Sequence, residues 1–530
     1  MSLLDHEPNR RGFLTLAGAM GAAAALVGTV SACAPGSSSS TGTTGATGGG
    51  AEANADGTIT AAISYELGTN GYDPMTTSSA LTIAANWHTL EGLTEVDPAT
   101  REVYAALAKD LPKATGTSVD IPLRDGAVFH DGSKVTADDV VFSFERVLDP
   151  ANKSLYRQFI PFVESVTKKD DSTVTLALKY PTALLAARLS VVKIVPKALV
   201  TADAKAFDAM PTGTGPWKLV DNGATSKSVA FERFDAYTGS RKARAKTMKW
   251  QVIPDAATRT NAIQSKSVQA IDSVPYLSID QLKATSQVDS VQGFGLLFAM
   301  FNQSPGNPFA KKENRQGFLY AIDMAKVVQT AMLDQAAPAT SFVQADHPQY
   351  VKAKTVYAHD PAKAKELFAK GGLTSLRLLC TDHDWVKKCT PIIQEALKAA
   401  GLQVEFTEKK SADVYNTIDG KPEAYDVVIA PGDPSVFGND LDVWTDSRMH
   451  WKGTPSYAEV QSLLDAGLQA TDEGKAKEAW GKLIDLIADE VPLYPLFHRK
   501  TPTAYDKASL VDFKPISLTG LSFVGVGSTK

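Results

Sequence analysis

Strand-like and helix-like patterns alternate along most of the chain. Apolar and polar residues alternate over 118–124, which predicts a strand, and a compact apolar run over 426–430 predicts a buried strand. Apolar residues at helical spacing over 136–148 predict a helix that Thr136 caps, with acidic residues in its first turn. Further strands are predicted over 58–65, 174–178, 376–379 and 404–406, and further helices over 81–90, 256–265, 321–333, 361–370, 391–400, 457–470 and 475–490. Strands that alternate with helices predict an α/β fold with partly parallel sheets.

The first 33 residues follow a different pattern. Arg10 and Arg11 precede an apolar stretch over 14–30 that is rich in Ala and Gly and carries no charge. This order is typical of a twin-arginine export signal peptide, with a transmembrane helix as the alternative. Small residues lead to Cys33, as in bacterial lipoproteins, so we expect removal of 1–32 and lipidation of Cys33.

A stretch poor in large apolar side chains follows Cys33. Residues 34–55 are mostly Ser, Thr, Gly and Ala, a composition that cannot bury enough surface to fold. We therefore expect a flexible tether between a membrane anchor and a folded part that begins near residue 57.

Composition narrows the classes of function. The 530 residues carry a formal net charge of −5, whereas nucleic-acid-binding proteins are normally basic. The length predicts several domains. The sequence lacks the H-E-x-x-H, G-x-S-x-G, G-x-x-x-x-G-K-[ST] and G-x-G-x-x-G motifs. We therefore expect no catalysis and no cofactor, with a secreted hydrolase of non-standard site as the rival from another class.

Four segments together resemble the peptide/nickel class of bacterial extracellular solute-binding proteins, which includes oligopeptide- and dipeptide-binding lipoproteins. The segments are FHDG at 129–132 with VTADDVVFSFER at 135–146, PTGTGPW at 211–217, Asn302 with Arg315 and Ala321-Ile322-Asp323, and DPAKAK at 360–365. We interpret the charges of 135–146 as helix caps and ion pairs rather than as a ligand site.

The resemblance implies a two-lobed periplasmic-binding-protein fold, type II-like, with the extra domain of the peptide-binding class. The expected parts are 1–32 as export signal, 33–56 as lipidated cysteine and tether, 57–86 plus 190–295 plus 499–530 as lobe I, 87–189 as the extra domain, and 296–498 as lobe II. It also implies a monomer that binds a ligand, most of all a peptide, between its lobes and delivers it to the permease subunits of an ABC importer. Nickel complexes, opines, sugars and haem are alternative ligands within the family, and a tethered receptor is an alternative use of the fold.

The predicted ligand contacts follow from the strand pattern and from the resemblance. Loops after the carboxyl ends of buried strands bind ligands in α/β proteins, which points to the segment after 426–430. Asp433 aligns best with a family Asp that pairs with the ligand's amino group. Phe301 and Asn302 lie in a segment that resembles the second hinge strand, where backbone groups can pair with an extended ligand. The full set of predicted contacts is Asp433, Pro434, Gly432, Phe437, Trp444, Phe301, Asn302 and Trp385.

Two cysteines lie close together in the sequence. Cys380, His383 and Cys389 form a local group with metal-binding residue types, so a nickel-type site is one interpretation. Because the expected compartment is oxidising, we instead predict a disulfide between Cys380 and Cys389 and no metal.

Overall fold

The computed structural model describes residues 52–65, 71–432, 440–449 and 451–530. The strands are β1 (Thr58–Ile63), β2 (Thr94–Val96), β3 (Val103–Ala105), β4 (Ser118–Pro122), β5 (Val163–Asp170), β6 (Thr173–Leu178), β7 (Trp217–Asn222), β8 (Ser228–Arg233), β9 (Thr247–Val252), β10 (Ala270–Ile271), β11 (Gln287–Phe301), β12 (Ala336–Pro338), β13 (Ser375–Thr381), β14 (Gln403–Lys409), β15 (Val427–Gly432), β16 (Leu493–Tyr505), β17 (Leu510–Val511) and β18 (Gly527–Ser528). The helices are α1 (Ala80–Thr89), α2 (Ala137–Leu148), α3 (Leu185–Arg188), α4 (Lys197–Ala202), α5 (Ala204–Ala209), α6 (Ala256–Gln264), α7 (Ile279–Leu282), α8 (Lys312–Ala321), α9 (Met324–Met332), α10 (Pro361–Gly371), α11 (Asp384–Ala399), α12 (Ser411–Gly420), α13 (Leu441–Arg448), α14 (Tyr457–Leu468) and α15 (Glu473–Glu490). Within these described ranges, no helix combines the length and the apolar character needed to cross a membrane.

One large mixed sheet organises the folded part. Its strand order is β14-β13-β15-β11-β16-β10-β1-β9-β8-β7, with β12 paired to β16. Strand β13 pairs in parallel with β14 and β15, and β1 pairs in parallel with β9 and β10. A separate antiparallel sheet consists of β4, β6 and β5. The predicted α/β layers with partly parallel sheets are therefore confirmed.

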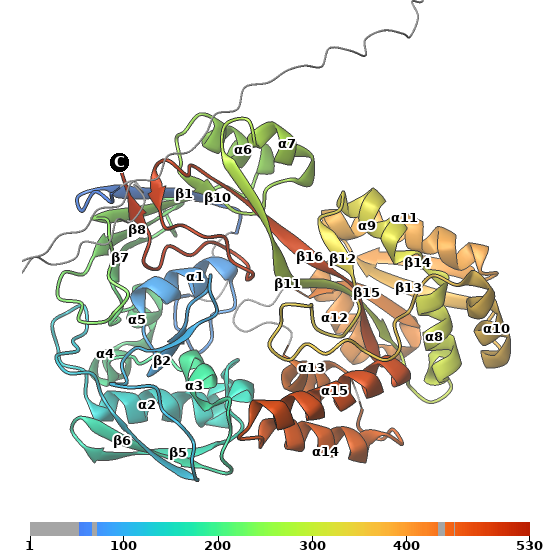
Figure 1. Ribbon diagram of the computed structural model, residues 1–530, viewed down its shortest axis with the longest axis horizontal. Helices are drawn as coiled ribbons and strands as arrows, with labels where there is room; N and C mark the ends of the chain where they lie inside the picture. Colours follow the sequence, from blue (N-terminus) through green and yellow to red (C-terminus); the bar gives the residue numbers. More distant parts are fainter. Residues whose placement is uncertain (1–51, 66–70, 433–439, 450) are drawn as a thin grey trace, which may run out of the picture. The chain divides into compact units, whose positions relative to one another are not determined.

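The long strands β11 and β16 join the two halves of the large sheet (Figure 1). Their antiparallel pairing runs from Gln287 opposite Tyr505 to Gln292 opposite Lys500, breaks, and resumes with Leu296 opposite His498. Gly293 and Gly295 lie in this break, and a side chain at Gly293 would collide with the hydroxyl of Thr501. The break marks the point where the two strands pass from one half of the sheet to the other.

Apolar side chains form separate buried clusters on this framework. We call the cluster between Leu296 and Phe497 the large core, the cluster between Leu93 and Ile194 the small-sheet core, and the cluster between Ile59 and Val526 the β1 core. The β1 core joins the two ends of the described chain, because β1 lies near its start and Val526 near its end. Each cluster buries one face of its own strands under helices.

The segment 135–146 folds as its local pattern predicts. Thr136 and Asp139 form a capping box at the start of α2, in which Asp139 Oδ2 accepts hydrogen bonds from the backbone N–H and hydroxyl of Thr136. Asp138 pairs with Lys168, and Arg146 pairs with Asp73. These contacts confirm the interpretation of the charges as caps and ion pairs.

The structure gives two of the predicted helices bounds that differ from the prediction. The expected helix over 321–333 is split, because α8 ends at Ala321 and Asp323 caps the new helix α9 by accepting from the N–H of Lys326. Helix α11 starts seven residues before the predicted start at Pro391 and contains this proline. Pro391 cannot donate to the carbonyl of Lys387, and the hydroxyl of Thr390 donates there instead at 3.3 Å. This substitute bond allows the helix to pass through the proline.

Candidate ligand-binding site

The largest described cavity lies where β11 and β16 cross between the sheet halves. Its volume is about 470 Å³, which is in the range of sites that bind small molecules. One wall comes from residues 273–277 with Ser517, Thr519 and Gly520. The other comes from Ala331 and Leu333 at the end of α9 and from His383, Asp384, Trp385 and Lys388 at the start of α11. Gly295 and residues 499–502, at the register break of the crossing strands, complete the lining. The cavity is therefore enclosed by segments from both halves of the large sheet.

Aromatic and basic side chains give this cavity its chemistry. Trp385 is half-buried, and the Arg499 guanidinium lies over its ring at 4.5 Å from the ring centre. Tyr276 adds a second aromatic side chain, and Lys388 and Lys500 add positive charge. Apolar rings with a few charged groups are the usual composition of a specific small-molecule site.

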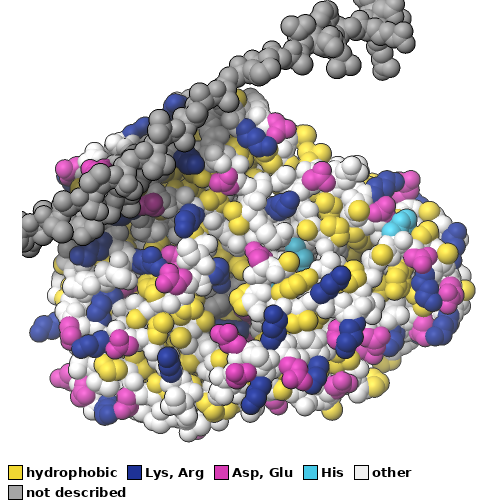
Figure 2. All heavy atoms as spheres, in the orientation of Figure 1, with side chains coloured by type: hydrophobic (Ala, Val, Ile, Leu, Met, Phe, Trp, Pro, Cys, Tyr) yellow, Lys and Arg dark blue, Asp and Glu magenta, His cyan; other side chains and the backbone are white. Residues whose placement is uncertain are grey.

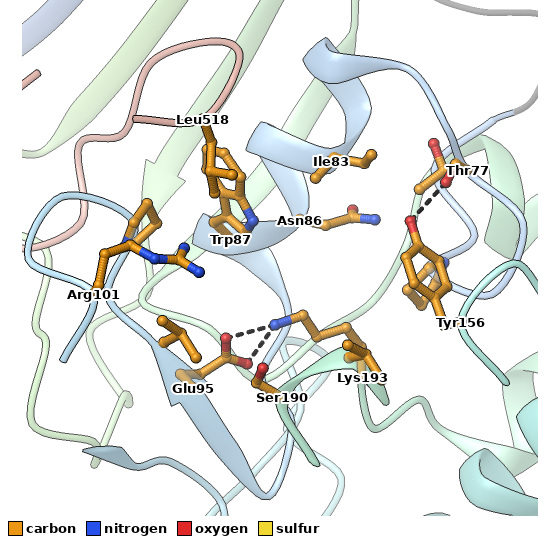
Figure 3. Close-up of a pocket in the computed structure, with 14 residues that line it drawn as sticks. Thr77, Ile83, Asn86, Trp87, Glu95, Arg101, Tyr156, Ser190, Lys193 and Leu518 are labelled. Carbon is orange, nitrogen blue, oxygen red and sulfur yellow. Dashed lines mark hydrogen bonds and ion pairs between the residues drawn. The ribbon is translucent and has the colours of Figure 1, made fainter. Parts of the chain in front are cut away.

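A second, much smaller cavity lies beside α1 and β2 (Figure 3). Its volume is about 50 Å³, enough for a few water molecules. Lys193 donates to both carboxylate oxygens of Glu95 at 2.5 and 2.6 Å, and Trp87 and Leu518 supply apolar walls. Its small volume makes this cavity a weaker candidate for a ligand site than the larger one.

A buried ionic network links the small-sheet core to the large core. Arg188 at the end of α3 donates to both oxygens of Asp442 in α13, at 2.8 and 3.1 Å, and both side chains are at most 5% exposed. Asp440 lies 3.8 Å from Arg188 and 3.4 Å from His347. Although burial opposes ionisation, Arg188, His347 and Arg101 hold the pKa of Asp440 down to about 2. A backbone hydrogen bond from Ala183 to Ala470, at 3.0 Å, joins the same two regions.

Two predicted ligand contacts are wrong. Phe301 is 4% exposed, stacks on Phe309 and meets Phe318 edge-on in the large core. Asn302 is equally buried, and its side-chain amide donates to the carbonyl of Tyr425 at 2.9 Å. The backbone hydrogen-bonding groups around them are also used, because β11 pairs with β15 on one edge and with β16 on the other. No edge is left there for a ligand strand, so both residues are structural.

Two other predicted contacts lie together at the end of β15. The ring of Trp444 packs so closely on Gly432 that a side chain at this glycine would overlap it. The same ring meets Phe298 and Phe342 edge-on at 5.7 and 5.8 Å. Gly432 pairs with Leu296, the neighbour of the cavity-lining Gly295. Their roles as ligand contacts stay predictions, and Asp433, Pro434 and Phe437 lie outside the described residues, as does Cys33.

Among the predicted contacts that the structure describes, Trp385 lines the large cavity. The sequence reasoning missed Tyr276, Lys388, Arg499 and Lys500, which line the same space. Arg499 and Lys500 belong to β16, one of the two strands that join the sheet halves, and a search for basic residues at expected strand crossings could have found them.

The predicted disulfide is wrong. Cys380 and Cys389 are both free and buried. Cys380 faces the large core from β13, whereas Cys389 lies in the second turn of α11, where its Sγ contacts the carbonyl of Trp385 and Sδ of Met332. Burial raises the pKa of both thiols, that of Cys389 to about 12, so both stay protonated and unreactive. In the described residues, no group of three or more His, Cys, Asp or Glu side chains is arranged to bind a metal ion.

We expect both thiols to be recovered free. If the protein is unfolded without a reductant in the presence of iodoacetamide and then digested, the peptides of Cys380 and Cys389 should each carry the alkyl group. Alkylation of the native protein should leave both unlabelled, because their sulfur atoms are buried. A peptide pair joined through Cys380 and Cys389 would contradict the structure.

Comparison with known proteins identifies the class. Residues 102–454 match the family of bacterial extracellular solute-binding proteins, family 5 Middle. The glutathione-binding protein GsiB of Escherichia coli K12 is 23% identical over 433 residues, covering 77% of this chain and 82% of GsiB. The ABC transporter substrate-binding protein CtaP of Listeria monocytogenes has a TM-score of 0.77 at 21% identity, covering 90% of this chain and all of the CtaP chain. The dipeptide-binding protein of Pseudoalteromonas sp. SM9913, solved with Met-Leu, has a TM-score of 0.74 at 19% identity, covering 89% of this chain and all of that one.

The chain belongs to family 5 of the bacterial extracellular solute-binding proteins. It has their two-lobed α/β fold, in which β11 and β16 connect the lobes. Membership of this family indicates a solute-binding role. The large cavity at the strand crossing is the candidate site for the solute.

Proposed function

We propose that this protein is a lipid-anchored component of an ABC importer that binds short peptides between its lobes and delivers them to the permease. The observation that carries the proposal is the cavity of about 470 Å³ at the crossing of β11 and β16, lined from both sheet halves. A ligand there touches both lobes at once, so its binding energy favours the closed arrangement.

Peptide is the favoured ligand because of the relatives. The name of GsiB refers to glutathione, and the Pseudoalteromonas protein was solved with a dipeptide. The cavity size and its mixture of aromatic and charged lining side chains suit a ligand of that kind.

The lipid anchor is proposed on sequence alone. Arg10-Arg11, the apolar stretch and Cys33 form the export signal, and residues 34–55 form the tether. Such an anchor would keep the binding protein close to its permease and raise its effective concentration there.

Native mass spectrometry of the full chain, produced in a bacterium that processes lipoproteins, tests both parts of the proposal. Under gentle conditions the protein should carry bound mass, and denaturation should release short peptides. The intact mass of the same preparation should correspond to a chain that begins at lipid-modified Cys33. Release of non-peptide compounds alone would refute the peptide ligand, and an unmodified chain that keeps residues 1–32 would refute the anchor.

A further inference from the structure

A further cavity lies at the start of α9, and we call it the α9 cavity. Its volume is about 260 Å³, and it shares no lining residue with the cavity at the strand crossing. Leu319, Met324 and Tyr357 line it, and residues 494–496 of β16 form its buried floor. Because an apolar cavity of about 150 Å³ can hold benzene, this volume is enough for a ring system of one or two rings.

The interior of the α9 cavity is apolar and aromatic. The rings of Tyr357 and Tyr494 meet edge-on, with 5.6 Å between their centres. The hydroxyl of Tyr357 is used, because it donates to the carbonyl of Ala488 at 2.5 Å, and Thr340 shares a hydrogen bond of 3.0 Å with Tyr350. In the described part of the chain the hydroxyl of Tyr494 has no hydrogen-bond partner, but its oxygen is buried, so a ligand can contact the ring and not the oxygen. The body of a ligand in this cavity must therefore be apolar.

The apolar lining differs from the surface around it. On the described face in Figure 2, basic and acidic side chains are interspersed. The α9 cavity instead leaves Met324, Val356 and Tyr357 half-buried, so that each keeps part of its apolar surface uncovered. Apolar side chains that line a hollow without being covered are typical of a ligand site.

A carboxylate oxygen at the mouth of the α9 cavity is available to a ligand. Asp323 Oδ1 caps α9 by accepting from the backbone N–H of Lys326 at 3.0 Å. Its Oδ2 lies 3.8 Å from Nδ1 of His359, which is too far for a hydrogen bond, and no described residue donates to this oxygen. Both Asp323 and His359 line the cavity, and both side chains are 40% exposed. A molecule that fills the cavity can therefore donate a hydrogen bond to Oδ2 of Asp323.

We propose that the α9 cavity is an accessory site for a small aromatic molecule that carries one N–H or O–H group. The aromatic ring packs against Met324, Tyr357 and Leu496. The donor group of the ligand meets Oδ2 of Asp323. Methionine sulfur and the edges of tyrosine rings are favourable neighbours for an aromatic ring. The inference goes beyond the proposed function and does not depend on it, because the imported solute is assigned to the other cavity.

Calorimetry with indole and indene tests the site, because the two probes share one shape and indene has a methylene group where indole has N–H. We expect both to bind. Asp323→Asn should weaken indole relative to indene by roughly fivefold or more, because an amide N–H group that cannot accept replaces Oδ2. Asparagine also caps helices, so α9 keeps its bond to Lys326. Asp360→Asn is the matched control and should leave the ratio of the two affinities unchanged, because Asp360 caps α10 by accepting from Lys363 at 2.9 Å but does not line the cavity.

The position of the probe can be measured without any variant. Crystals of the protein grown with a bromine-substituted indole should show the bromine, by its anomalous scattering, between the start of α9 and residues 356–359. Bromine found only in the cavity at the strand crossing or elsewhere would overturn the inference. So would a lack of binding by both probes, or an equal change of the affinity ratio in Asp323→Asn and Asp360→Asn. None of these results alters the expected release of peptides, so failure of the accessory site leaves the proposed function standing.

Discussion

Replacing Arg188 by alanine should shift the ligand-free protein toward an open arrangement of its lobes. The change leaves the carboxylate of Asp442 buried without the guanidinium that it meets at 2.8 and 3.1 Å. Leaving one charge of a buried pair unpaired costs about 3–5 kcal/mol. Separation of α3 from α13 would return Asp442 to water and avoid this penalty. Small-angle X-ray scattering should show a larger radius of gyration than for the unaltered protein.

Two further variants test whether the unpaired charge of Asp442 causes the opening of the lobes. Arg157→Ala removes an exposed arginine from the same region and should leave the scattering profile unchanged. The double variant Arg188→Met with Asp442→Leu removes both charges, and it should recover most of the compact form, because an apolar pair of similar size replaces a buried ion pair at little cost. If Arg188→Ala scatters like the unaltered protein, the pair does not control lobe closure.

Acidification should destabilise the protein well before most carboxylates are protonated. Burial lowers the pKa of His88, His130 and His498, each to about 4 from an ordinary value of 6.5. Below pH 6.5 the unfolded chain takes up protons that the folded chain excludes, so stability is complete above pH 6.5 and falls until about pH 4. Between pH 8 and pH 5 each histidine should remove on the order of 2 kcal/mol.

Burial keeps these imidazoles neutral, and in two of them hydrogen bonds to both ring nitrogens fix which nitrogen carries the proton. His88 Nδ1 lies 2.7 Å from the carbonyl of Ala84, to which it donates, and Nε2 accepts from the N–H of Phe523 at 2.9 Å. His130 Nε2 donates to the carbonyl of Gly215 at 2.9 Å, and its Nδ1 accepts from the N–H of Gly213 at 3.2 Å. Protonation of either ring would turn an acceptor into a donor that faces another N–H group.

Urea unfolding at pH 8 and pH 5 checks this prediction. The free energy of unfolding should be lower at pH 5, and the variant His88→Gln with His130→Gln should show a shallower dependence on pH, although it is less stable at pH 8. Identical stability of the unaltered protein at the two values would show that these imidazoles titrate normally in the folded state.

The ligand site could be predicted from the sequence only in part. Trp385 was predicted as a contact and lines the cavity, whereas Phe301 and Asn302 belong to the packed interior. A hinge strand and a core strand have the same apolar pattern, and the decision depends on whether both edges are paired. Strand β11 has β15 on one edge and β16 on the other, and no local signal reports these neighbours.

Local chemistry by itself determined the elements whose start and stop signals lie within a few residues. Thr136 and Asp139 define the start of α2, and Asp360, Pro361 and the left-handed Gly372 delimit α10. The start of α11 was missed because Pro391 resembles a helix start, and only the bond from Thr390 to the carbonyl of Lys387 shows that the helix continues.

Only the tertiary structure decided which distant residues meet. Cys380 and Cys389 are close in sequence yet unbonded, because a core strand and a helix turn carry them to separate contacts. Arg188 and Asp442 are 254 residues apart and form a buried pair. Caps and side-chain periodicity act over one or two turns and can be read from sequence. Pairing across the sheet and between the lobes depends on how the whole chain closes on itself, and that information is spread over hundreds of residues.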